Sequence, residues 1–467
     1  MKKLLTLLFA LLITAAIAVS LASCGEDNVK TVTIKVYNWG QYISEGKIDE
    51  DGNPTYNTNA EFSKYFTKKL ENDEEFAKKI ESIYGEKVKI KVSYSTYPTN
   101  EDMYTKISSG AASYDIIIPS DYMIKRLADE GLLYNFGAEN IENYKYIDEA
   151  FKNASYDEFN QYSVPYTYGM VGIIYNYTLL DSKDLDENGN ITKESWDLMW
   201  NEGYNGDYTG KILQFNNPRD AFATAMYKEG ININSDNPED WKAALDLLVQ
   251  QKPLVQAYVS DEIFNKMTNA SAAIAAYYAG DFITMYADNE YLKFYYPEEG
   301  TNYFVDAMCI PEASQHKEVA MEYINFMLSR DAAVANALAI GYASPNTQVR
   351  NDPEYIEAMT DIHPDAMDIL YGMSPEEANV NYKHDPDYKS FTDTDIFENV
   401  TLDLVGSLWE ELKTESAVEP WIHVVSGTIV LAVVSIATYS IITRRVRSRD
   451  YRKRDKELKK KKALAKK

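Results

Sequence analysis

The sequence predicts an α/β protein of two lobes, and three observations lead to this fold class. Apolar residues alternate with polar ones in several segments, as in strands, and segments with helical spacing lie between them. The chain has 467 residues, more than a single hydrophobic core usually holds. A stretch punctuated by proline and glycine, residues 164–169, separates a first group of such segments from a second. Strands alternating with helices indicate a largely parallel sheet.

The first lobe begins with a strand at residues 32–36, where valine and isoleucine alternate with polar residues. We then expect helical structure at 62–83, a strand at 88–94, a short helix at 103–107, a buried strand at 114–119 and a helix at 122–130. Trp39 and Tyr42 follow the first of these strands, and Ser120 and Tyr122 follow the third. Ligands of parallel sheets gather at the carboxyl ends of strands, so these four side chains are predicted to line one cleft.

The second lobe is predicted to begin with a strand at residues 170–176. Helices are expected at 195–200, 219–229 and 238–251, with a helix of small residues at 270–276. A strand at 302–311 then returns to the first lobe. Residues 317–340 are predicted to form two helices broken at 330–331, and residues 353–415 are predicted to be helical again.

Asp306 lies in the middle of the apolar strand predicted at 302–311. A buried charge is costly unless a cation or hydrogen-bond donors meet it, so this carboxylate invites a partner. An alternative is a structural carboxylate that accepts backbone N–H bonds.

The formal net charge is −25, although the residues after 443 are strongly basic, so the body of the chain is more acidic than this total. Such a body repels nucleic acid and favours cations. The two cysteines, Cys24 and Cys309, provide no disulfide framework within the exported body.

Both ends of the chain indicate a membrane. Lys2 and Lys3 precede an apolar run, and residues 21–24, Leu-Ala-Ser-Cys, resemble the box of a bacterial lipoprotein signal. The resemblance implies cleavage after residue 23 and a lipid on Cys24, whereas the alternative is a simple secretory signal cleaved nearby. Residues 421–442 lack Asp, Glu, Lys and Arg and are long enough for the ~20 residues of a transmembrane helix.

We therefore predict a transmembrane helix at 421–443, with a buried amphipathic helix as the alternative. The basic residues of 444–467 follow directly, and basic flanks stay in the cytoplasm. This places the binding domain on the extracellular or periplasmic side of the cell membrane and the tail inside.

Five strings of the body resemble the spermidine/putrescine-binding proteins of bacterial ABC importers. They are Tyr37-Asn38-Trp39-x-x-Tyr42, Ser93-Tyr94-Ser95-Thr96-Tyr97, Tyr114-Asp115-Ile116-Ile117-Ile118-Pro119-Ser120, Gly280-Asp281 and Gly341-Tyr342-x-x-Pro345-Asn346. The resemblance implies a periplasmic-binding-protein-like (type II) fold with two hinge strands, near Gly169 and Asp306. One lobe would comprise 30–168 and 306–350, and the other 169–305 and 351–415.

The resemblance also implies the site residues. The aromatic box of the family falls on Trp39, Tyr42, Tyr122, Tyr278, Phe304 and Tyr342. The polar residues that it implies, together with Ser120, are Asp121, Asn217, Asp220, Asp281 and Asp306. Tyr278 and Phe304 stand where spermidine binders usually carry tryptophan, and Asn217 and Gln41 stand where an acid is common. Each aromatic taken singly could instead be ordinary core packing.

The chemistry of these residues suits a polyamine, a chain of ammonium groups separated by methylenes. Carboxylates hold ammonium groups by charge-assisted hydrogen bonds, and ring faces attract cations and bury the methylenes. Because Asn217 and Gln41 remove two possible charges, putrescine is slightly favoured over spermidine. We expect an ABC permease with its ATPase as partner, a monomer, and neither cofactor nor metal.

Other functions are weighed against this one. The chain has four histidines, and none lies in a nucleophile motif or at metal-ligand spacing, so no enzyme is expected. A two-lobe binder of ferric iron would use paired tyrosines as anionic ligands. Such ligands do not call for an aromatic box that includes Trp39. A membrane-anchored polyamine sensor is the third possibility. The family normally needs no C-terminal transmembrane helix, so the helix predicted here departs from its pattern.

Overall fold

The computed structural model describes residues 29–47, 54–233, 235, 237–301, 303–372 and 402–414. Contacts divide the chain into two units, Met1–Trp409 and Glu410–Lys467. The first unit contains the sheet, the helices around it and the site discussed below, and only the last residues of one helix are described in the second.

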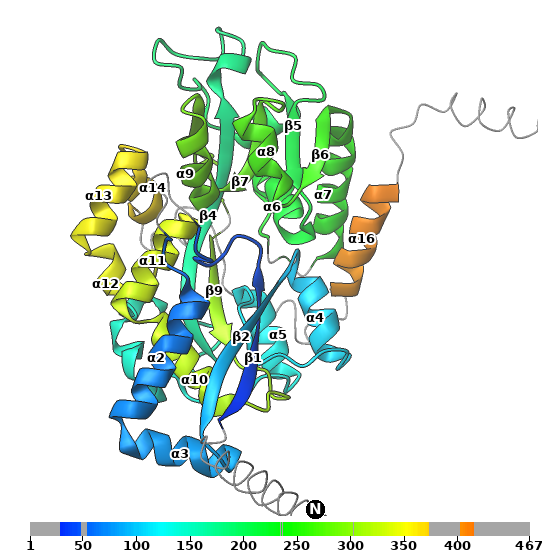
Figure 1. The fold of residues 1–467 in the computed structure, drawn as a ribbon. Helices are drawn as coiled ribbons and strands as arrows, with labels where there is room; N and C mark the ends of the chain where they lie inside the picture. Colours follow the sequence, from blue (N-terminus) through cyan, green and yellow to red (C-terminus); the bar gives the residue numbers. More distant parts are fainter. Residues whose placement is uncertain are drawn as a thin grey trace, which may run out of the picture. The chain divides into compact units, whose positions relative to one another are not determined.

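The first unit is organised by strands in the order β2-β1-β3-β9-β4-β7-β5-β6, with β8 beside β4. The strands are β1 (Lys30–Trp39), β2 (Val88–Tyr97), β3 (Ile116–Ile117), β4 (Ser163–Asn176), β5 (Ile212–Phe215), β6 (Val255–Val259), β7 (Ile274–Tyr278), β8 (Leu292–Tyr295) and β9 (Tyr303–Cys309). β1 pairs in parallel with β2 and β3, and β5 pairs in parallel with β6 and β7. In Figure 1, β1 and β2 lie in the lower half of the picture and β5, β6 and β7 in the upper half.

β4 joins the two groups. Its first half pairs with β9, from Ser163 opposite Cys309 to Met170 opposite Tyr303. Its second half pairs with β7 and β8. The first lobe is thus the sheet of β1, β2, β3 and β9 with the start of β4, and the second lobe is that of β5 to β8 with the end of β4. The two-lobe α/β architecture predicted from the sequence is confirmed.

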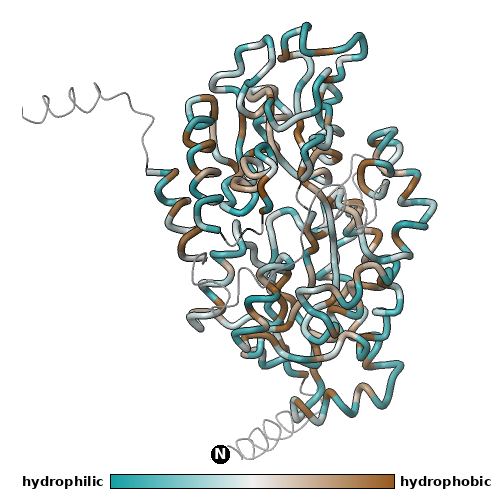
Figure 2. The backbone as a smooth tube through the Cα atoms, turned by 180° about the vertical axis from the view of Figure 1, so that it is seen from behind, coloured by the Kyte–Doolittle hydropathy of each residue, from teal (hydrophilic) through white to brown (hydrophobic). Residues whose placement is uncertain are grey.

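Helices cover these sheets. They are α2 (Thr58–Asn72), α3 (Glu74–Tyr84), α4 (Asn100–Ser108), α5 (Asp121–Asp129), α6 (Pro218–Lys228), α7 (Pro238–Gln251), α8 (Glu262–Thr268), α9 (Ala279–Asp288), α10 (Lys317–Met327), α11 (Arg330–Ile340), α12 (Thr347–Arg350), α13 (Pro353–Ile362), α14 (Ala366–Tyr371) and α16 (Leu402–Thr414). Short 3-10 turns are η1 (Ala138–Asn140), η2 (Glu142–Tyr146), η3 (Glu149–Phe151), η4 (Tyr177–Leu179), η5 (Trp196–Trp200) and η6 (Lys252–Leu254). In Figure 2, hydrophilic and hydrophobic residues alternate along the helices, as expected for helices that pack one face on a sheet.

Side-chain caps explain where several helices begin. The predicted helical stretch 62–83 divides at Asp73, whose carboxylate accepts a hydrogen bond from the backbone N–H of Phe76 and caps α3. α6 and α7 each begin with proline after an asparagine cap, Asn217 and Asn237. Local sequence therefore fixes these helix starts.

The helix predicted at residues 270–276 is wrong. The chain there enters β7, in which Ala275 pairs with Leu213 of β5 and Ala276 pairs with Ile173 of β4. Alanine favours helices, but these fully buried alanines lie between two neighbouring strands, and tertiary pairing overrides the local preference. Three further strands, β5, β6 and β8, were not predicted, and only two residues of the strand predicted at 114–119 join the ladder.

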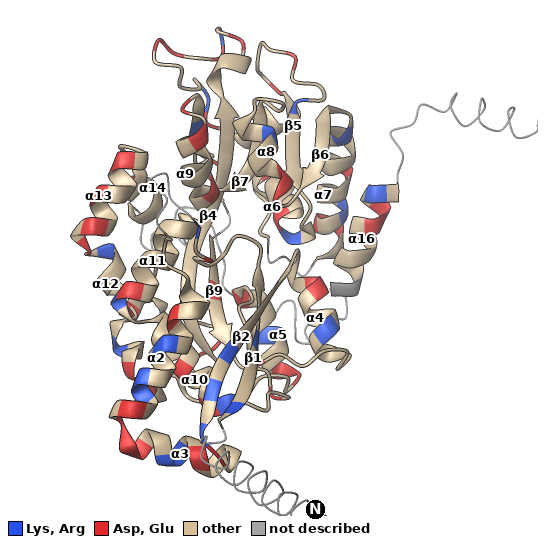
Figure 3. Cartoon of the chain, in the orientation of Figure 1, with Lys and Arg blue, Asp and Glu red and all other residues tan. Residues whose placement is uncertain are grey.

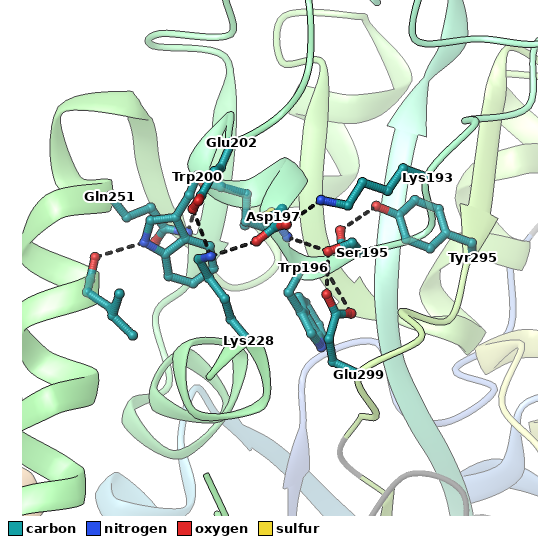
Figure 4. A network of polar contacts seen from close by, with 12 residues as sticks. Lys193, Ser195, Trp196, Asp197, Trp200, Glu202, Lys228, Gln251, Tyr295 and Glu299 are labelled. Carbon is teal, nitrogen blue, oxygen red and sulfur yellow. Dashed lines mark hydrogen bonds and ion pairs between the residues drawn. The ribbon is translucent and has the colours of Figure 1, made fainter. Parts of the chain in front are cut away.

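A polar network ties the loop around η5 to α6 in the second lobe (Figure 4). The Lys228 ammonium lies 2.6 Å from Asp197 Oδ1 and 2.9 Å from Glu202 Oε2. The Ser195 hydroxyl donates a hydrogen bond to the Glu299 carboxylate. These partners satisfy one another, so the network holds the lobe together rather than offering free groups to a ligand.

Several predicted features lie outside the described residues, namely Cys24, the predicted span at 421–443 and the basic tail. Among the helices that are described, none combines the length and apolar character needed to cross a bilayer. The lobe boundaries at 168–169 and 305–306 remain predictions.

Candidate ligand-binding site

A cavity of about 300 Å³ lies between the two lobes. Ligand sites in proteins are usually concave pockets of about 300–1,000 Å³, so this one suits a slender molecule. Its walls come from the carboxyl ends of β1, β5 and β6, from the starts of α5, α6 and α9, and from β9. Both parallel groups therefore point their carboxyl ends at the same space, where ligands of such sheets collect.

All twelve ligand-binding residues predicted from the sequence line this cavity. They are Trp39, Tyr42, Ser120, Asp121, Tyr122, Asn217, Asp220, Tyr278, Asp281, Phe304, Asp306 and Tyr342. The structure thus brings together side chains from distant parts of the chain, from Trp39 to Tyr342.

Asp306 is the buried carboxylate of β9, with 4% of its surface exposed. Its Oδ2 accepts a 2.5 Å hydrogen bond from the hydroxyl of Tyr42, which lies 2.6 Å from the Thr167 hydroxyl. Oδ1 is buried and makes no well-formed hydrogen bond to any described residue. Burial raises the pKa of Asp306 to about 7, although hydrogen bonds from Ser120 and Tyr42 lower it. This carboxylate is accordingly short of positive partners.

Asp220 lies in the first turn of α6, where the partial positive charge of a helix N-terminus favours a carboxylate. Its Oδ2 accepts hydrogen bonds from the Tyr278 hydroxyl at 2.5 Å and from Asn217 Nδ2 at 2.9 Å. Asn217, which also caps this helix, therefore orients Asp220 instead of adding a charge.

Asp281 occupies the first turn of α9, directly after β7. The hydroxyl of Tyr342 donates a 2.9 Å hydrogen bond to its Oδ2. Burial raises the pKa of Asp281 to about 8; the Tyr342 bond lowers it and the charge of Asp261 raises it. The carboxylates of β9, α6 and α9 thus come from three separate elements, and acidic segments are visible on α6 and α9 in Figure 3.

Asp121 is also in the cavity wall, but its oxygens are used by the backbone. Oδ1 accepts from the N–H of Tyr122 at 2.7 Å, and Oδ2 accepts from the N–H of Val305 at 3.0 Å. These bonds tie the start of α5 to β9. The geometry therefore suits a residue that holds the wall in place at least as well as one that contacts a ligand.

Four of the six predicted aromatic residues form one cluster of rings. The ring centroids of Tyr42 and Tyr342 are 5.3 Å apart, and those of Tyr278 and Phe304 are 5.2 Å apart. Phe304 and Tyr342 connect the two pairs at 5.9 Å. Rings on elements of both lobes therefore contribute to this cluster.

Trp39 and Tyr122 stand apart from that cluster. Trp39 contacts Tyr97, which pairs with it in the β1–β2 register, at a centroid distance of 4.7 Å. Tyr122 donates a hydrogen bond to Glu101 at 2.9 Å, and the guanidinium of Arg219 lies 5.2 Å from its ring. The cavity consequently has a ring cluster and a more polar flank.

Several residues that line the cavity were not predicted from the sequence. They include Tyr97, Arg219, Asp261, Glu262 and Phe264. Tyr97 could have been found, because it ends a strand next to the one that Trp39 ends. Asp261 and Glu262 follow β6, and they were missed because that strand was not recognised. Within the described residues, no group of three His, Cys, Asp or Glu side chains is arranged to hold a metal ion.

Comparisons with known proteins agree with this architecture. A family model described as bacterial extracellular solute-binding protein matches residues 74–360. The spermidine/putrescine-binding periplasmic protein of Escherichia coli (strain K12) is 27% identical over 365 residues, covering 78% of this chain and 91% of that protein. A solved structure from Listeria monocytogenes, named after a spermidine/putrescine ABC transporter, has 28% identity and a TM-score of 0.62, covering 82% of this chain and 99% of that one.

A further solved structure is the spermidine/putrescine ABC transporter substrate-binding protein of Streptococcus pneumoniae. It has 27% identity and a TM-score of 0.55 and covers 82% of this chain and 98% of that one. The similarity extends along most of the part of the chain that carries the two lobes.

Proposed function

Since the chain belongs to the family of bacterial extracellular solute-binding proteins, we propose that it captures a polyamine, putrescine or spermidine, between its lobes and delivers it to an ABC permease. The family consists of solute-binding proteins and not of enzymes. The observation that carries the proposal is the arrangement of Asp306, Asp220 and Asp281 around one narrow, ring-lined cavity. Relatives named for spermidine and putrescine binding support it.

The proposed binding mode follows from the chemistry of a polyamine. Each ammonium group has only donors to offer, and carboxylates are acceptors that bind it by short, charge-assisted hydrogen bonds. The methylenes between them would lie against the rings of Tyr42, Tyr342 and Phe304, where each cation–ring contact contributes about 0.5–2 kcal/mol. Ligand charge would also relieve the repulsion among carboxylates that share a cavity.

Lobe closure is the proposed signal to the permease. β4 and β9 are the strands that pass between the lobes, and Gly169 on β4 pairs with Phe304 on β9. We propose hinges at these strands, with lobes of 30–168 and 306–350 on one side and 169–305 and 351–415 on the other. A ligand that contacts both lobes shifts the population towards the closed form, and the permease would recognise that form.

Membrane attachment completes the proposal. A lipid on Cys24 and a transmembrane helix at 421–443 would hold the binding domain on the extracytoplasmic side, with the basic tail in the cytoplasm. This part rests on the sequence patterns alone. The proposed helix would be a second membrane anchor besides the lipid, and for this reason a membrane-bound polyamine sensor is the alternative function.

Isothermal titration calorimetry of the purified full-length chain tests the binding proposal. Putrescine, spermidine and spermine are the ligands, and lysine and arginine are the controls, because each of these carries a carboxylate as well as its cationic groups. We expect saturable binding of at least one polyamine and none of either amino acid at the same concentration. Equal binding of lysine, or no heat with any polyamine, would overturn the proposal.

A further inference from the structure

Two acidic residues outside the predicted set, Asp261 and Glu262, line the cavity. They directly follow β6, and Glu262 begins α8. The carboxylate of Glu262 accepts a 3.0 Å hydrogen bond from the backbone N–H of Ser260, which fixes its position. This end of the cavity therefore has two carboxylates that were not predicted from the sequence.

Asp261 reaches from the second lobe to the first. A Cβ atom placed on Gly40, just after β1, would lie 2.4 Å from Asp261 Oδ2. The carboxylate therefore lies directly against the backbone of the opposite lobe, and it can do so because residue 40 has no side chain. Its position depends on the lobes being together.

Among the described residues, no lysine or arginine forms an ion pair with the carboxylates at this end of the cavity, namely Asp261, Glu262 and Asp281. The charge of Asp261 disfavours ionisation of Asp281, and burial together with Glu262 raises the pKa of Asp261. Asp261 thus lies close enough to Asp281 and to Glu262 for their charges to repel its own.

A buried carboxylate of the same cavity also has an oxygen without a hydrogen-bond partner among the described residues. Asp306 is buried, and its Oδ1 has no well-formed hydrogen bond in the described part of the chain. The ring pair of Tyr42 and Tyr342 connects the two acidic ends, because the Tyr42 hydroxyl bonds Asp306 and the Tyr342 hydroxyl bonds Asp281. Acidic groups therefore lie on both sides of the rings.

We propose that Asp261 and Asp281 together hold one ammonium group of the ligand, while Asp306 and Asp220 hold the others. The site then selects a triamine such as spermidine over a diamine. This inference rests on the proposed function and reverses the slight preference for putrescine drawn from Asn217 and Gln41. Asp261 is the residue that determines this specificity.

The test compares the affinities of the full-length chain for spermidine and putrescine in four forms: wild type, Asp261→Asn, Gly40→Ala and Asp288→Asn. Asp261→Asn removes the carboxylate with almost no change in shape. Gly40→Ala keeps the charge but displaces it, since the added methyl group occupies the place of Oδ2. Asp288→Asn is the matched control, because Asp288 is an exposed residue of the same lobe and does not line the cavity.

Asp261→Asn is expected to weaken spermidine binding at least tenfold and putrescine binding less than threefold. Gly40→Ala should act in the same direction, and Asp288→Asn should change either affinity less than twofold. Unchanged spermidine affinity in Asp261→Asn, or equal losses for both ligands, would overturn this inference alone. If the wild type binds no polyamine at all, the proposed function fails first and the inference falls with it.

Discussion

The hydroxyl of Tyr42, from the loop after β1, lies 2.5 Å from Oδ2 of Asp306 on β9 and donates a hydrogen bond to it. The bond occupies one carboxylate oxygen and leaves the other facing the cavity without a well-formed bond to the described residues. A buried carboxylate held in this way is fixed in direction and still short of charge compensation.

The first prediction concerns Asp306 itself. Asp306→Asn keeps the size of the side chain and removes the charge, so polyamine affinity should fall at least tenfold, about 1.4 kcal/mol. Calorimetric titration with putrescine and spermidine measures this change, and Asp288→Asn controls for the loss of one negative charge. An unchanged affinity would mean that the ligand does not bind beside Asp306.

The second concerns pH. Burial raises the pKa of Asp306 to about 7 and of Asp281 to about 8, well above the values near 4 of an unfolded chain. A cation binds the ionised forms, so binding should release protons, and affinity should rise as pH increases from 6 to 8.5. The slope should reach up to about tenfold per pH unit for each proton released.

Without ligand, the pH dependence of folding stability is opposite to that of polyamine affinity. The folded chain binds these protons more tightly than the unfolded chain does, so the two groups favour folding at low pH and lose that contribution as pH rises through 7 and 8. Titrations in buffers of different ionisation enthalpy count the protons released on binding. A polyamine affinity that is flat between pH 6 and 8.5 contradicts the prediction.

The third prediction separates the contribution of the Tyr342 ring to polyamine affinity from that of the Tyr342 hydroxyl. Tyr342→Phe keeps the ring contacts with Tyr42 and Phe304 and removes the hydrogen bond to Asp281. Tyr342→Ala removes both, and the additional loss should amount to about 0.5–2 kcal/mol, the size of one cation–ring contact. Titration of both variants with the same polyamine gives the difference directly, and equal affinities would exclude a contribution from the ring.

The fourth is steric and changes no charge. A Cβ atom on Gly280 would lie 2.4 Å from Cδ2 of the Tyr342 ring, so Gly280→Ala must push that ring into the cavity or strain α9. Overpacking of this kind costs about 1–3 kcal/mol, and we expect a lower melting temperature together with weaker polyamine binding. Thermal unfolding and titration measure the two effects. Wild-type values for both would show that the ring has room to move.

The finding that the predicted residues line one cavity has a physical basis. Trp39 and Tyr42 follow one strand and Ser120 and Tyr122 another, and the carboxyl ends of neighbouring parallel strands meet at one edge. Residues such as Tyr278 and Phe304 could not be placed by this rule. Their positions in strings that resemble a known family identified them, and the structure puts them in the same cavity.

The failures have a common cause as well. The segment 270–276 has the composition of a helix, and β5, β6 and β8 are short, so their strand character comes from pairing with neighbours. Missing β6 meant missing Asp261, which follows it. A local pattern does not contain that information, because a short buried strand is stabilised by residues distant in sequence.

The amino-acid sequence by itself determined the alternation of strands and helices, the starts of α3, α6 and α7, and the chemical character of the site, because periodicity, capping and residue type are local properties. The tertiary structure decided which side chains face each other. Only the tertiary structure places Asp261 against Gly40 and brings the acidic residues of one end of the cavity together, with no ion pair to a lysine or arginine among the described residues, since those contacts join residues far apart in the chain.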